Sequence, residues 1–194
     1  MMNKITLTDL CKNHSFWSLM KLTQKYKEFK FVESKFSIFF LFIILIYFKL
    51  LNSELMVITI LQNIIVLITP VLIGIIGFIF TGLALMSTII THKVLSQIDK
   101  EEKTASVAGI LFSFYFCSGI IVSAVICGSI FLALTYEDFY TWFECGRCIM
   151  WFSLVLTIYF HIFSLFYSVS LLGTCLKFFF VNVYYLNKCE NKIE

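Results

Sequence analysis

Residues 56–90 read MVITILQNIIVLITPVLIGIIGFIFTGLALMSTII and contain no Asp, Glu, Lys or Arg. An apolar run longer than about 18 residues is typical of a transmembrane helix. This run would form a helix of about 50 Å, whereas the hydrocarbon core of a bilayer is about 30 Å thick. The helix must therefore tilt, bend or protrude. A bend is expected at Pro70, because proline has no backbone N–H to donate a hydrogen bond.

The composition of the whole chain supports the same class. Its 194 residues are 60% hydrophobic, 18% aromatic and only 14% charged, and the mean hydropathy is +0.92. Soluble domains carry about a quarter charged residues, so this chain has too few polar side chains to cover a surface in water. Disordered, collagen-like and disulfide-stapled secreted proteins are excluded, and a small helical membrane protein is indicated.

Three further apolar runs resemble the first. We therefore predict an all-α integral membrane protein with four transmembrane helices, over residues 36–51, 56–90, 106–135 and 149–176. The run 36–51 is the shortest, about 24 Å long, so Lys35 and Lys49 are expected to extend their ammonium groups toward the two interfaces. The predicted division is a basic juxtamembrane arm (1–35), a transmembrane domain (36–182) and a tail (183–194).

The basic residues predict the orientation. All of the 15 Lys and Arg residues except Lys49 and Arg147 would lie on one side of the four predicted spans. Because cytoplasmic flanks are enriched in positive charge, we expect both termini in the cytoplasm of a cell whose plasma (inner) membrane holds the protein. Lysines of the arm are expected to approach anionic headgroups, although they could also serve topology alone. They are Lys21, Lys25, Lys27 and Lys30.

Small residues recur at helical spacing in two of the spans. Such residues let another helix approach closely, which is how helices associate in lipid. This face could join copies of the chain in a homo-oligomer, or it could pack within one four-helix bundle. The residues are Gly74 and Gly77 in the second span, and Gly109, Ser113, Cys117, Ala124 and Gly128 in the third.

The last span carries a polar stripe. Its members project onto one helical face, and they are Ser153, Thr157, His161, Ser164 and Ser168. His161 is the only ionisable residue deep in a predicted span, which makes it a functional candidate. It could relay protons, contact a ligand or sense pH. The favoured interpretation is a packed, neutral histidine that is hydrogen-bonded across helices.

Cys145 and Cys148 form a C-x-x-C at the start of the last span, where they could pair as a disulfide. In this motif and in the four-helix layout the chain resembles the vitamin K epoxide reductase family, which implies thiol redox chemistry. That family also uses a cysteine pair in an outward loop, and no cysteine lies between the first two spans here. A redox protein is therefore a minor alternative.

Several enzyme classes lack their motifs. The chain has three histidines and no H-E-x-x-H, no acidic residue in a predicted span, and no G-x-S-x-G or P-loop. We expect no enzyme, no catalytic residues, no metal site, no cofactor and no direct binding to nucleic acid.

The segment Gly77-Phe78-Ile79-Phe80-Thr81-Gly82-Leu83-Ala84, in a small chain with four spans, resembles the membrane proteins of anti-phage defence systems of the Kiwa membrane-subunit type. The resemblance implies a tetramer-like assembly that responds to membrane events, with a soluble protein partner on the cytoplasmic side. We therefore expect an oligomeric multi-pass membrane protein that acts as a sensor, effector or interaction subunit in antiviral defence. The alternative is a small channel or transporter that uses the polar face of the last span.

Overall fold

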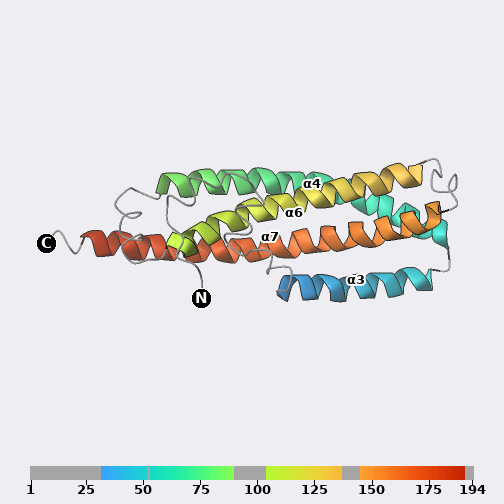
Figure 1. Cartoon of the computed structure of the whole chain (residues 1–194), viewed down its shortest axis with the longest axis horizontal. Helices are drawn as coiled ribbons and strands as arrows, with labels where there is room; N and C mark the ends of the chain where they lie inside the picture. Colours follow the sequence, from blue (N-terminus) through green and yellow to red (C-terminus); the bar gives the residue numbers. More distant parts are fainter. Residues whose placement is uncertain (1–31, 52, 90–103, 137–144, 191–194) are drawn as a thin grey trace. The chain divides into compact units, whose positions relative to one another are not determined.

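Four α-helices make up the computed structural model over the residues that it describes, which are 32–51, 53–89, 104–136 and 145–190. They are α3 (Val32–Leu50), α4 (Glu54–Ile89), α6 (Thr104–Thr135) and α7 (Gly146–Glu190), traced in Figure 1. The prediction of an all-α chain with four helices is confirmed for this part of the chain.

The helices match the predicted spans in place but differ from them in length. Helix α4 runs without interruption through Pro70. Helix α7 has 45 residues, which corresponds to about 68 Å at 1.5 Å per residue and exceeds the thickness of a hydrocarbon core. It continues into residues 183–190, which the sequence had assigned to a tail.

Three of the described helices are long and apolar enough to cross a membrane. Their apolar stretches are Glu54–Ala84, Gly109–Thr135 and Gly146–Leu176, with hydropathies of 2.7, 2.3 and 1.9. Helix α3 is not among them; its 19 residues include Glu33, Lys35 and Lys49. The chain is therefore a multi-pass membrane protein by the length and composition of its helices.

The contacts within the chain divide it into two compact units. The α3 unit contains α3 together with the described parts of the other helices that lie within 54–77, 118–136 and 145–168. The second unit contains the parts within 78–89, 104–117 and 169–190. Within the second unit α4 packs against α6, because a Cβ atom on Gly82 would lie at an ordinary contact distance, 3.5 Å, from Cε1 of Phe114.

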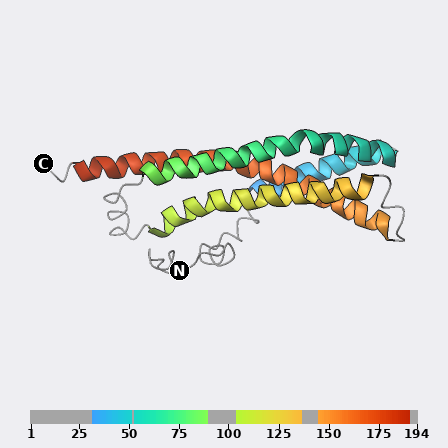
Figure 2. The same ribbon diagram turned by 90° about the horizontal axis from the view of Figure 1, so that it is seen from above.

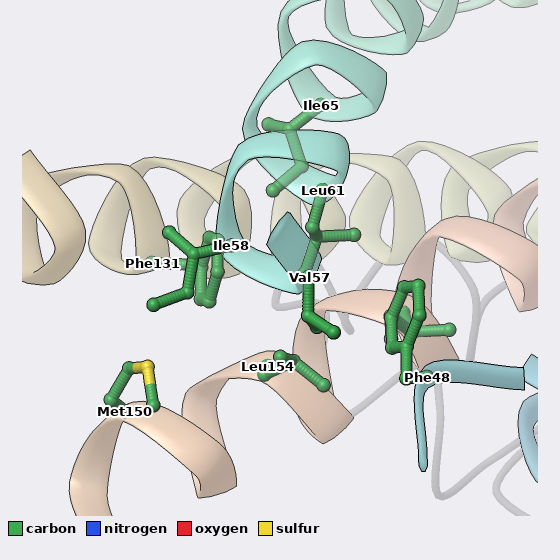
Figure 3. Close-up of a cluster of buried hydrophobic side chains, with 9 residues drawn as sticks. Phe48, Val57, Ile58, Leu61, Ile65, Phe131, Met150 and Leu154 are labelled. Carbon is green, nitrogen blue, oxygen red and sulfur yellow. The ribbon is translucent and has the colours of Figure 1, made fainter. Parts of the chain in front are cut away.

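A cluster of buried apolar side chains holds the α3 unit together, and Figure 3 shows eight of its members converging from all four helices. Lipid tails are as apolar as these side chains, so the cluster stabilises the fold through close van der Waals packing rather than through removal from water. The cluster consists of Phe48 from α3, Val57, Ile58, Leu61 and Ile65 from α4, Phe131 from α6, and Met150, Leu154 and Ile158 from α7.

Helix α3 lies antiparallel against the part of α7 that belongs to the same unit (Figures 1 and 2). In the middle of α3, the ring of Phe40 lies 5.5 Å from that of Phe166, measured between centroids. The hydroxyl groups of Ser34 and Tyr159 are 3.0 Å apart. At the other end of α3, Phe48 joins the core cluster. These contacts position the end of α3 beside the start of α7.

Candidate functional site

The polar stripe of α7 faces the interior of the α3 unit. Ser153, Thr157, His161 and Ser164 are buried, and Ser168 is half-buried. Because they recur every three or four residues, they share one helical face, and their burial shows that this face is packed against protein rather than lipid.

Three hydroxyl groups of the stripe, those of Thr157, Ser164 and Ser168, donate to backbone carbonyls. Thr157 Oγ1 donates to the carbonyl of Cys127 in α6 at 3.0 Å, which joins the two helices. The other two bonds lie within α7, from Ser164 to the carbonyl of His161 at 2.8 Å and from Ser168 to that of Ser164 at 2.7 Å. A hydroxyl that bonds to backbone can be buried in an apolar interior at low cost.

His161 is 5% exposed, and its Nδ1 atom lies 2.8 Å from the carbonyl oxygen of Thr157. A carbonyl only accepts hydrogen bonds, so Nδ1 carries the proton and donates it. We expected a bond across helices, but the observed bond lies within α7, because one helical turn brings the ring against the carbonyl of residue i−4. The Nε2 atom is buried and has no hydrogen-bond partner among the residues that the structure describes.

Gly128 of α6 faces the ring of His161. A Cβ atom on Gly128 would lie 3.1 Å from Cγ2 of Ile65 in α4 and 3.2 Å from Cε1 of His161. Both distances are shorter than ordinary contacts of a Cβ atom, so the close approach of three helices requires the absence of a side chain here. Ala124, one turn earlier in α6, is fully buried.

The other small residues lie in two kinds of surroundings. Ser113 and Cys117 are buried, and Ser113 donates to the carbonyl of Gly109 at 2.9 Å. A Cβ atom on Gly74, Gly77 or Gly109 would meet no atom within 4 Å. The Cβ positions of these three glycines therefore lie outside the packing of the residues that the structure describes.

A pocket that the sequence did not predict lies where α3 ends and α4 and α7 begin. Its volume is about 380 Å³, and its lining consists of Leu45, Phe48, Lys49, Ser53, Glu54, Val57 and Trp151. The indole Nε1 of Trp151 donates to Oε1 of Glu54 at 3.0 Å, and Nε of Arg147 lies 4.0 Å from the same oxygen. Glu54 and Trp151 are 97 residues apart, and no spacing in the sequence indicates their contact.

The cysteine pair lies at the start of α7, as predicted. Cys145 and Cys148 are exposed, free thiols, and the carbonyl of Cys145 accepts from the backbone N–H of Ile149 at 3.1 Å. Among the described residues no group of three or more His, Cys, Asp and Glu side chains could hold a metal ion. The arm lysines Lys21, Lys25, Lys27 and Lys30 lie outside the described residues.

No protein-family model, no curated protein and no solved structure matches this chain.

Proposed function

We propose that this chain is the membrane subunit of a homo-oligomeric assembly that acts as a sensor, effector or interaction partner. The observation that carries the proposal is the open surface of α4 at Gly74 and Gly77. Both residues are exposed, and a Cβ atom on either glycine would meet no atom of the described residues within 4 Å.

The pattern of burial along α4 places the two glycines away from the buried side of the helix. The buried residues Ile58, Ile65, Leu72 and Ile79 recur every seven positions, so they form one stripe along the helix. Gly74 and Gly77 lie two positions from Leu72 and Ile79, which places them on the opposite side at 100° per residue. Small residues in an apolar helix let a second backbone approach closely, and another copy of α4 would fill this surface.

We also propose that α3 is a fourth span. Its outward side chains include Phe36, Phe39, Phe42 and Ile46, all of them exposed, and lipid would cover them. Lys35 and Lys49 are at the two ends of this apolar part, where their ammonium groups can extend to the headgroups. Four spans place both termini on one side, and the positive-inside rule makes that side the cytoplasm.

The basic arm and tail would then face a cytoplasmic protein partner. The resemblance of residues 77–84 to defence-system membrane proteins supports a role in the response to phage. A plating assay tests this role: cells that express the chain with its genomic neighbours should lose protection when the chain is deleted. Equal plaque counts with and without the chain would contradict it.

The assembly is tested by the mass of the protein in mild detergent. The parent chain should be an oligomer, and Gly74→Leu with Gly77→Leu should shift it to smaller species without loss of helicity. Gly173→Leu is the matched control, because a Cβ atom on Gly173 also meets no atom within 4 Å, and it should keep the mass of the parent. A monomeric parent, or an unchanged mass in the double variant, would contradict the proposal.

A channel or transporter is the second candidate. It is favoured by the buried Nε2 atom of His161, which could face an ion or a proton path if the helices separate. Reconstituted vesicles separate the two candidates, because a channel should carry ion flux above the rate of protein-free vesicles. Ion flux that is lost in the folded variant His161→Gln would favour the channel. Flux of the parent equal to the protein-free rate would exclude the channel.

A further inference from the structure

We propose that the pocket between the ends of α3, α4 and α7 binds the headgroup of a phospholipid that carries both a phosphate and a primary ammonium group, as phosphatidylethanolamine does. This inference requires the α3 unit to be inserted in a bilayer, and it is independent of whether the chain forms an oligomer.

The position of the pocket fits a lipid headgroup. Its lining contains the last turn of α3 and the first turn of α4, with Lys49 and Glu54 respectively. Trp151 lies in the second turn of α7, in the first part of an apolar stretch that begins at Gly146. Tryptophan side chains with a polar edge concentrate at the level of the headgroups. The pocket therefore opens where the glycerol and the headgroup of a lipid lie.

The apolar walls of the pocket could contact the part of an acyl chain that is next to the glycerol. Phe48 and Val57 are buried and Leu45 is half-buried, and all three line the pocket. A volume of about 380 Å³ lies within the range of about 300–1,000 Å³ that is typical of small-molecule sites. A glycerol group and the first carbons of a chain can lie against these apolar side chains.

The charges of the lining match a zwitterion. Lys49 provides one cation for the phosphate. Trp151 and the exposed Arg147 both approach Oε1 of Glu54, which leaves Oε2 as the carboxylate oxygen that would accept from the ammonium. The bond from Trp151 to Oε1 of Glu54 holds the carboxylate at the rim of the pocket. Each charge is also favoured by its helix end, because Lys49 lies in the last turn of α3 and Glu54 in the first turn of α4.

Glu54 also explains why the ammonium should be primary. A primary ammonium has three N–H donors that can approach a carboxylate oxygen directly. The methyl groups of choline remove these donors and keep the nitrogen farther from the oxygen. An anionic headgroup, such as phosphatidylglycerol, would bring its phosphate to Lys49 but would offer nothing to pair with Glu54.

Trp151 can report binding, because it lines the pocket and the chain has only three tryptophans. In the variant Trp17→Phe/Trp142→Phe, all tryptophan emission comes from Trp151. This parent variant would be reconstituted in phosphatidylcholine vesicles that contain a small fraction of lipid dibrominated near the glycerol end of its chains. Quenching by brominated phosphatidylethanolamine should exceed that by brominated phosphatidylcholine about 1.4- to 5-fold, the range expected for one exposed ion pair.

Three substitutions in this parent variant locate the headgroup. Glu54→Gln keeps an acceptor for the indole N–H but removes the charge, so the preference for ethanolamine over choline should disappear. Lys49→Gln should weaken quenching by both lipids by a similar factor, because both carry a phosphate. Lys35→Gln is the matched control at the other end of α3, and it should behave as the parent.

Stepwise N-methylation of the lipid gives the same test without any change in the pocket. Quenching of the parent variant should fall along the series from phosphatidylethanolamine through its monomethyl and dimethyl forms to phosphatidylcholine. Equal quenching along this series, stronger quenching by phosphatidylglycerol than by phosphatidylethanolamine, or an unchanged preference in a folded Glu54→Gln variant would each overturn the proposal.

Discussion

The edge of the His161 ring fills the space that a side chain at position 128 would need: Cε1 of His161 lies 3.2 Å from the Cβ position of Gly128. Ile65 of α4 approaches the same position to 3.1 Å. Three helices of the α3 unit therefore meet at one glycine. The stability of the unit should depend on this position and not on the open glycines elsewhere in the chain.

The effect of a substitution at Gly128 should grow with the size of the new side chain. Alanine would gain up to about 1 kcal/mol of helix propensity, but overpacking typically costs about 1–3 kcal/mol, so Gly128→Ala should be neutral to destabilising and Gly128→Leu clearly destabilising. Gly109→Leu is the control, because its Cβ position is open. Unfolding in detergent and the oligomeric mass should be measured together. Equal stability of Gly128→Leu and Gly109→Leu would contradict the close approach at Gly128.

His161→Phe should destabilise the protein and His161→Gln should not. Phenylalanine removes the N–H that donates to the carbonyl of Thr157, a bond worth about 0.5–1.5 kcal/mol, and its longer ring would press against Gly128 at a cost of about 1–3 kcal/mol. Glutamine can still donate. This prediction is tested by the unfolding midpoints of the two variants, each compared with that of the parent. If both variants fold as well as the parent and both lose the cellular phenotype, His161 has a proton-coupled role instead.

Thr157→Val should weaken the contact between α7 and α6. Valine keeps the shape of threonine but removes the donor to the carbonyl of Cys127, and hydrogen bonds between transmembrane helices average about 0.6 kcal/mol. The control is Thr59→Val, which removes a hydroxyl that donates to Leu55 within its own helix. The difference between the two variants in a detergent unfolding titration measures the bond between helices. A zero difference would show that this bond adds nothing to stability.

Thiol labelling tests the proposed orientation. Cys145 and Cys148 are exposed at the start of α7, so a membrane-impermeant maleimide should label them in intact cells after mild reduction. Cys11 and Cys189 should react only after the cells are permeabilised, because the positive-inside rule places both termini in the cytoplasm. Single-cysteine variants keep the four signals separate. Labelling of Cys189 but not of Cys145 in intact cells would invert the topology.

The sequence alone was sufficient to predict the four helices and the polar residues that share one face of α7. Helix formation in an apolar run is local, because in lipid every backbone N–H must bond within its own segment. The stripe from Ser153 to Ser168 follows from the helical period. The end of α7 was not predicted, since apolarity stops near Leu176, whereas a helix continues through polar residues as long as its backbone bonds are made.

Only the tertiary structure decided which of the small residues are packed. Gly128 and Gly109 look alike in the sequence, but Gly128 meets Ile65 and His161 while Gly109 faces open space, because the difference depends on the neighbouring helices. The same holds for the bond between Glu54 and Trp151, which joins the starts of two helices. Helical periodicity determines the face on which a side chain lies, but the crossing of the helices determines what that side chain meets.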